Sequence, residues 1–309
     1  MKNLSFADKE FFCQQVFDSH GPYWHIATPG TSSEMLFISQ DDYRFGVTLV
    51  AESLHYCGVK TYSFSLMSNH LHNIAETPTR QRCIDFLEHY VSRLRRYASE
   101  AKRNLDMSGF ICDPLPIDNL QSLRNNIVYV DRNQYVINAS QTPYSNPWGS
   151  GFLYFGYSPE YIASSPFSSL TVRAKRSLTH SRDPHYPNSF VVRDGFIAPE
   201  SFVDWKTGRS FFRDAHQYFN LLTKNREAYA EFATLYGDRV VLTDEEMYSA
   251  AVNIASKEYQ IEKLDRLSDR QKKEIARTLH YNYHAGNAQI YRILKLDKYW
   301  LREVFPEAR

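Results

Sequence analysis

Residues 62–72 of the chain read YSFSLMSNHLH, and the residues around them show a regular alternation. Residues 61–66 alternate aromatic and small polar side chains, which is typical of a half-buried strand. Met67-Ser68-Asn69 predicts a turn, and His70 to Ala75 predicts a further core strand. The stretch therefore predicts two consecutive strands of a sheet, joined by a short turn.

His70 and His72 give this strand pair a chemical feature. Residues at i and i+2 of a strand point to the same face of the sheet, so the two imidazoles can converge on one metal ion. Leu71, between them, is expected to point into the core. A bare His-x-His pair is more often two ordinary surface histidines, so the metal-site hypothesis depends on a second element.

Tyr129 and Asn133 supply that element on a helix predicted further along the chain. Residues at i and i+4 share one face of a helix, so the phenol and the carboxamide project toward one site. An amide oxygen suits Mg²⁺ or Mn²⁺, which also accept imidazole. Two histidines and Asn133 would leave coordination positions for water and a phosphate oxygen. Without the histidines, Tyr129 would be interpreted as a core tyrosine.

The segments around the histidine pair predict the fold class. Strands are expected at residues 23–27 and 35–38, before the strand pair. Helices are expected at residues 41–57, with Val47, Val50 and Leu54 on one face, at 78–104, and from 117 or 118 to 134. Asp113-Pro114-Leu115-Pro116 is interpreted as a break. Short strands with helices between them predict an α+β fold with a mostly antiparallel sheet covered by helices.

The rest of the chain predicts a loop-rich segment followed by helices. Residues 151–208 are rich in Ser, Pro, Tyr and Phe, and indicate loops wrapped on the core or a linker. Helices are expected at residues 209–236, 244–257, 268–281, 288–294 and 297–304. The last three fit a helix-turn-helix and a plain packing module equally well. The expected domains are therefore residues 1–150, 151–208 and 209–309.

Composition narrows the class of protein. The net charge is only +1, so any nucleic-acid-binding groups must be clustered and balanced by acids elsewhere. The four cysteines form no CxxC pair, which favours reduced thiols in a cytoplasmic protein. No apolar run approaches the ~20 residues that span a bilayer, and the first residues contain no apolar signal core. A cytoplasmic protein without a membrane partner is expected.

Residues 62–72 resemble the HUH strand pair of bacterial single-tyrosine transposases, in particular the REP-associated tyrosine transposases. Residues 124–133, RNNIVYVDRN, resemble that family's tyrosine helix, and Pro147-Trp148-Gly149-Ser150 its Trp-Ser-Ser element. The resemblance covers about residues 20–152, with the motifs in the family's order. Two positions depart from the pattern, since Gln134 replaces a proline and Asn73 replaces an apolar residue.

The resemblance implies a fold, an activity and a site. The fold is a ferredoxin- or RRM-like HUH core. Tyr129 is the nucleophile, and His70, His72 and Asn133 hold one Mg²⁺ or Mn²⁺ ion. The enzyme cuts and rejoins single-stranded or hairpin DNA through a 5′-phosphotyrosine, in the cytoplasm at the nucleoid. Family members occur as dimers, so the resemblance implies a homodimer, although no feature of the sequence decides it.

Two basic clusters are candidate DNA contacts, because lysine and arginine bind phosphates. The alternative for both is an ordinary solvated surface. The first cluster, on the helix expected at residues 78–104, is Arg93, Arg95, Arg96, Lys102 and Arg103, and the second is Arg173, Lys175, Arg176 and Arg182.

Two other classes of protein compete with this interpretation. A non-catalytic DNA-binding regulator derived from a transposase would keep the fold, but it would be expected to lose at least one of His70, His72, Tyr129 and Asn133. A zinc-dependent hydrolase has no support, because the sequence contains no HExxH and no acidic or cysteine ligands at a telling spacing.

Overall fold

The computed structural model describes residues 5–28, 36–103, 113–137, 147–156, 164–182, 186–224, 244–261, 263–283 and 285–306. Contacts within the chain divide it into two compact units, residues 1–225 and 226–309. The first unit contains both sheets, and the second is helical in its described part. The predicted α+β class with antiparallel sheets is confirmed.

The main sheet has four antiparallel strands in the order β2-β3-β1-β4. They are β1 (Tyr23–Ala27), β2 (Lys60–Leu66), β3 (Leu71–Glu76) and β4 (Leu115–Ile117). The predicted strand pair is confirmed as the hairpin β2-β3, in which Ser65 pairs with His72. The hairpin closes through the amide of Met67, which donates to the carbonyl of His70 at 2.9 Å.

Two sequence expectations for strands are wrong. Residues 36–38 form no strand, because the amides of Leu36 and Phe37 bond to the single carbonyl of Ser68 in the hairpin turn. Met35, the first residue of that expected strand, lies outside the described residues. Leu115 and Pro116, expected to belong to a break, and Ile117, a possible start of the next helix, instead pair with β1 as strand β4. Pro116 is tolerated there because β4 lies at the edge of the sheet.

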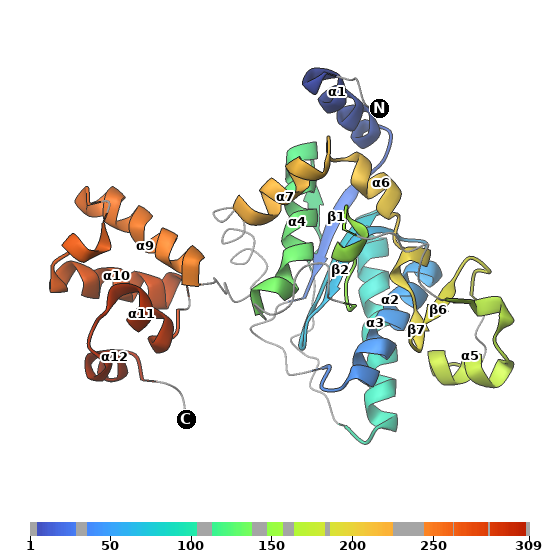
Figure 1. Ribbon diagram of the computed structural model, residues 1–309. Coiled ribbons are helices and arrows are strands. Elements are labelled where there is room, and N and C mark those ends of the chain that lie inside the picture. The colour runs from blue at the N-terminus through green and yellow to red at the C-terminus, as the bar shows by residue number, and fades with distance from the viewer. Residues whose placement is uncertain are drawn as a thin grey trace. The chain divides into compact units, whose positions relative to one another are not determined.

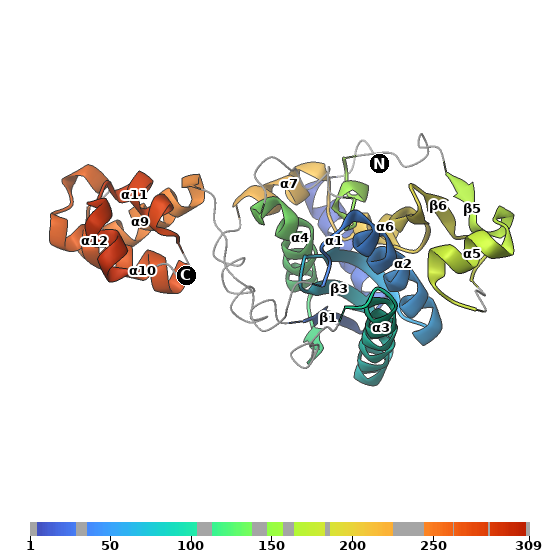
Figure 2. The ribbon, with the colours of Figure 1, turned by 90° about the horizontal axis from the view of Figure 1, so that it is seen from below.

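Helices cover both faces of the main sheet (Figures 1 and 2). Helices α2 (Gln40–Cys57) and α3 (Arg80–Glu100) pack on one face, and α4 (Leu120–Ile137) packs on the other. The predicted apolar face of α2, made of Val47, Val50 and Leu54, is buried. The helix begins at a Ser39–Asp42 capping box.

Burial on both faces corrects the expectation that β2 is half-buried. All residues from Thr61 to Leu66 are buried. Phe64 packs in the apolar core with α2 and α3, whereas Ser63 and Ser65 lie on the face that α4 covers. The hydroxyl of Ser63 donates to the carboxylate of Asp131 on α4 at 2.7 Å. The small polar residues of the alternating pattern therefore face polar groups of a helix rather than solvent.

Residues 147–224 are part of the first unit. Their described elements are η1 (Gly151–Leu153), β5 (Ser165–Pro166), η3 (Phe167–Ser169), α5 (Val172–Thr179), β6 (Val191–Arg193), β7 (Phe196–Ile197), η4 (Pro199–Ser201), α6 (Trp205–Ser210) and α7 (Ala215–Lys224). Phe152, Leu153, Phe196 and Val203 belong to the same buried cluster as the residues of α2 and β2. The described part of this segment thus packs on the core, within a compact unit that extends to residue 225.

An N-terminal helix, α1 (Phe6–Asp18), adds an element that the sequence patterns did not predict. It begins at a capping box formed by Ser5 and Asp8. Its contacts run mainly to α4 and α6. Its exposed Phe6, Phe11 and Phe12 blur the apolar stripe by which a packed helix is usually found.

The second unit contains α9 (Asp244–Tyr259), η5 (Leu264–Arg266), α10 (Asp269–Tyr283), α11 (Asn287–Leu294) and α12 (Lys298–Val304). These helices confirm the four expected C-terminal helices, with ends that differ by at most two residues. The helix expected at residues 209–236 is interrupted, since α6 ends at Ser210 and α7 begins at Ala215. Residues 225–236 of that expectation lie outside the described residues. No helix in the described part of the chain is long and apolar enough to cross a membrane.

Candidate functional site: a histidine–tyrosine cluster between the sheet and helix α4

The two motif histidines lie together beneath helix α4. His72 is on β3 and His70 immediately precedes that strand, so the strand begins one residue later than expected. Both side chains are buried, and their ring centroids are 5.0 Å apart with the rings nearly perpendicular. Leu71 is fully buried in the apolar core, as the alternation predicts. The histidines are therefore not ordinary surface residues.

Helix α4 brings Tyr129 to this pair. The Tyr129 ring is buried, and its centroid lies 5.4 Å from that of His72 at an interplanar angle of 89°. Asn133 follows one helical turn later and is also buried. Segments about 60 residues apart in the sequence thus place the predicted nucleophile directly against a predicted metal ligand.

A third histidine, His25, belongs to the cluster and was missed by the sequence analysis. It lies on β1 opposite Ile74, and therefore on the same face of the sheet as His72. Its Nε2 is 3.1 Å from Nδ1 of His72, and its ring centroid is 6.1 Å from that of Tyr129. A single histidine in YWHIA carries no motif. Only the β1–β3 register reveals its position.

Hydrogen bonds from helix α4 set the tautomers of two histidines. The side-chain NH₂ of Asn126 donates to the carbonyl of Ser122 at 2.9 Å, which turns its Oδ1 toward the sheet. That oxygen is 2.7 Å from Nδ1 of His25, and an amide oxygen only accepts, so His25 carries its proton on Nδ1. When His25 is neutral, its Nε2 accepts from Nδ1 of His72. His72 is left with its lone pair on Nε2.

His70 has the same tautomer by a local contact. Its Nδ1 is 2.8 Å from Oδ1 of Asn69, so Nδ1 is again the donor and Nε2 holds the lone pair. Metal-binding histidines in proteins usually donate the second ring N–H to a fixed acceptor in this way. The chemistry of the donor set, two Nε2 atoms and the amide of Asn133, therefore fits a divalent ion.

A second type of metal site would be made only of His, Cys, Asp or Glu side chains. Within the described ranges, no three side chains of these types are grouped to hold an ion. The predicted set has two histidines and an amide, so it is not of that type. The three described cysteines, Cys13, Cys57 and Cys83, are not joined in disulfides.

Asp131, two residues after Tyr129, fastens α4 to its surroundings. Its carboxylate accepts from Ser63 at 2.7 Å and from the hydroxyl of Tyr218 on α7 at 2.8 Å. Burial raises the pKa of this carboxyl group to about 7, and the hydrogen bonds from the two hydroxyls oppose that rise. Asp131 thus joins β2, α4 and α7 directly behind the cluster.

Three candidate DNA contacts of the first cluster are engaged within the protein: Arg93 and Arg96 on α3, and Arg103 just beyond the end of that helix at Glu100. Arg93 pairs with Glu52 at 2.9 Å and donates to a carbonyl at the end of α5. Arg96 donates to a neighbouring carbonyl there at 2.7 Å. Arg103 pairs with the buried Asp42 at 2.7 Å. These three arginines hold α5 and the start of α2 against α3.

The other basic candidates are more accessible. Arg95, Lys102 and Arg173 are exposed and have no ion pair within the described part of the chain. On α5, Arg176 is exposed and Lys175 lies 5.2 Å from the ring centroid of Phe167. The structure therefore leaves a smaller set of cations available for phosphates than the sequence indicated.

The Asn126 contact leads to a test of the cluster. If His70, His72 and Asn133 hold Mn²⁺, Asn126→Ala is expected to weaken its binding about 10-fold or more, because His25 and then His72 lose the acceptor chain that keeps the lone pair of His72 on Nε2. Electron paramagnetic resonance of free Mn²⁺ measures this affinity. Asn125→Ala is the matched control, since that side chain accepts from Gln121 on the same helix. Unchanged Mn²⁺ affinity in folded Asn126→Ala would contradict the assignment.

No protein-family model, curated protein or solved structure matches this chain.

Proposed function

We propose that the protein is a metal-dependent single-tyrosine transposase of the HUH type, which cuts and rejoins single-stranded DNA. The observation that carries the proposal is the contact between the rings of Tyr129 and His72, with His70 beside them. The order β2-β3-β1-β4, with α2 between β1 and β2 and α3 between β3 and β4, supports a ferredoxin-like core.

His70, His72 and Asn133 would hold the divalent ion, the histidines through Nε2 and the asparagine through its amide oxygen. A bound Mg²⁺ or Mn²⁺ supplies Lewis acidity, which polarises the scissile phosphate and favours the phenolate of a nearby tyrosine. Asn126 and His25 keep His72 in the tautomer that this role requires. The protein residues thus provide both the ligand atoms and their orientation.

Tyr129 would be the nucleophile. A phenol in water has a pKa of about 10, so it needs a neighbouring cation to react at neutral pH. Its oxygen bonds to the phosphorus while the phenol proton passes to water, the bond from phosphorus to the 3′-oxygen breaks, and that oxygen takes up a proton from water. The products are a 5′-phosphotyrosine and a free 3′-hydroxyl. Because the phosphodiester energy is kept, the reverse reaction rejoins strands without ATP.

The substrate would be single-stranded at the cut, in DNA that folds into a hairpin. A tyrosine fixed on a buried helix reaches only a backbone that can enter the site. The accessible cations Arg95, Lys102, Arg173 and Arg176 would contact phosphates away from the cut. Such contacts make the affinity fall as salt rises.

The experiment is a cleavage assay on labelled hairpin DNA taken from the flanks of the gene. The purified protein is incubated with Mn²⁺ or Mg²⁺, or with a chelator, and resolved on a denaturing gel. The proposal requires a metal-dependent covalent protein–DNA adduct together with a released strand ending in a 3′-hydroxyl. Binding without an adduct under either metal would instead make the protein a non-catalytic DNA-binding regulator.

A further inference from the structure

The first unit contains a pocket that shares no lining residue with the histidine–tyrosine cluster. Its volume is about 590 Å³, within the roughly 300–1,000 Å³ range of small-molecule sites. Helices α1 and α6, which lie side by side in Figures 1 and 2, form its main walls. Aromatic and basic side chains predominate: Phe12, Phe155, Trp205, Phe212, Lys9, Lys206, Arg209 and Arg213.

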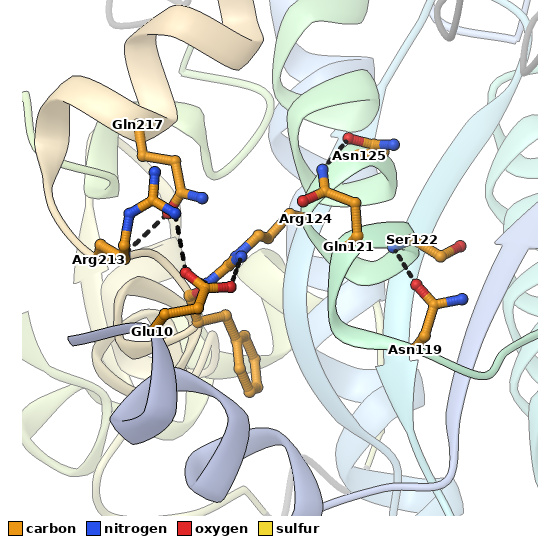
Figure 3. Close-up of polar contacts among 9 residues, drawn as sticks. Glu10, Asn119, Gln121, Ser122, Arg124, Asn125, Arg213 and Gln217 are labelled. Carbon is orange, nitrogen blue, oxygen red and sulfur yellow. Dashed lines mark hydrogen bonds and ion pairs between the residues drawn. The ribbon is translucent and has the colours of Figure 1, made fainter. Parts of the chain in front are cut away.

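An ion-pair network fixes one wall of the pocket (Figure 3). Glu10 on α1 binds Arg124 of α4 and, at 2.9 Å, Arg213. Lys9 is 3.8 Å from Asp214. Arg213 and Lys9 are therefore each paired with a carboxylate, although Glu10 is shared with Arg124, and these contacts join α1 to the segment between α6 and α7.

Lys206 and Arg209 are the other two cations that line the pocket. Neither has an ion pair within the ranges that the structure describes. Both stand over aromatic rings instead: the Arg209 guanidinium is 4.8 Å from the centroid of Phe155, and the Lys206 ammonium is 5.5 Å from that of Trp205. Lys206 is exposed and Arg209 is half-buried, so an anion can reach them from solvent.

We propose that this pocket binds one nucleotide of a single DNA strand. The phosphate would pair with Lys206 and Arg209, and the base would stack on the accessible rings of Phe12 and Trp205. Unpaired bases present their faces to aromatic side chains, whereas bases in a duplex do not, so the pocket favours a single strand. That the ligand is DNA rests on the proposed function. That the ligand combines an anionic group with a flat ring is inferred from the pocket's cations and aromatic side chains alone.

Fluorescence anisotropy with labelled oligo(dT), which forms no hairpin, tests the proposal. The double variant Lys206→Ala/Arg209→Ala is expected to bind about 10-fold more weakly than the wild type, with a shallower dependence on salt. Arg80→Ala/Arg82→Ala removes the same charge from the exposed start of α3 and is expected to bind like the wild type. Equal affinity in both double variants would overturn the pocket assignment.

Photocrosslinking gives a second readout that does not depend on charge. Oligo(dT) containing 5-iododeoxyuridine is expected to crosslink to peptides carrying Phe12 or Trp205, and crosslinks confined to other peptides would overturn the proposal. The cleavage assay on the same variants separates the two ideas. If the wild type forms the covalent adduct but Lys206→Ala/Arg209→Ala binds oligo(dT) as the wild type does, only the pocket proposal fails. If oligo(dT) crosslinks to the pocket peptides but no adduct forms, only the proposed enzymatic function fails.

Discussion

Tyr129→Phe is expected to abolish the covalent protein–DNA adduct, a loss of at least about 1,000-fold, because the variant lacks the attacking oxygen. Phenylalanine keeps the ring that packs against His72 and His25, so the fold and Mn²⁺ binding should persist. The measurement is the fraction of labelled hairpin DNA that becomes covalently bound in the presence of Mn²⁺.

Tyr43→Phe is the matched control for this substitution. Tyr43 is half-buried and stacks on Trp148 with ring centroids 5.2 Å apart, a contact that phenylalanine keeps. This variant should form the adduct at the wild-type rate. An adduct that survives in Tyr129→Phe would assign the reaction to another tyrosine, and Tyr135, whose side chain lies outside the described residues, would be tested next.

Arg124→Met is expected to lower the free energy of unfolding by about 2–4 kcal/mol. The Arg124 side chain is only 2% exposed, donates to the carbonyl of Phe211 at 2.6 Å and pairs with Glu10 at 2.6 Å (Figure 3). Methionine fills much of the space but leaves a buried carbonyl without its donor. Because Glu10 is 38% exposed, water can partly replace its partner, which keeps the expected loss below that of a fully buried pair.

Urea unfolding of the wild type and the variant measures this loss. Arg80→Ala is the control, since its pair with Asp113 is exposed and is expected to contribute within about 0.5 kcal/mol. The hydrogen bond from Arg124 lowers the pKa of Glu10, so the stabilisation is present at neutral pH and is lost as pH falls through that lowered pKa. In Arg124→Met, the free energy of unfolding should lack this part of its dependence on pH. Unfolding midpoints that match the wild type would contradict the role of Arg124.

Local patterns predicted the elements that carry the motif. The hairpin β2-β3 was readable because its turn residues and alternation are adjacent in the sequence. The apolar face of α2 was readable because Val47, Val50 and Leu54 recur at helical spacing. Bringing Tyr129 against His72 also required α4 to cross the correct face of the sheet, which only the family resemblance indicated.

Tertiary features escaped the sequence analysis for physical reasons. The position of His25 depends on the β1–β3 register, which no short-range pattern encodes. The alternating residues of β2 indicate that the strand has one apolar face and one polar face. They do not indicate that α4 covers the polar face. Edge strand β4 has only three residues and contains Pro116, so its sequence does not indicate a strand. It forms because it pairs with β1. Arg93 appeared available for DNA because Glu52, its partner, is 41 residues away in the sequence.

Peptide mapping of the covalent adduct tests the central claim most directly. Trypsin cuts after Arg124 and Arg132, which releases residues 125–132, NNIVYVDR, a peptide in which Tyr129 is the only residue with a hydroxyl group. After reaction with hairpin DNA and Mn²⁺, nuclease trimming and trypsin digestion, mass spectrometry should find a nucleotide phosphate on Tyr129 of this peptide. A nucleotide attached to any other peptide, with residues 125–132 unmodified, would contradict the proposed mechanism.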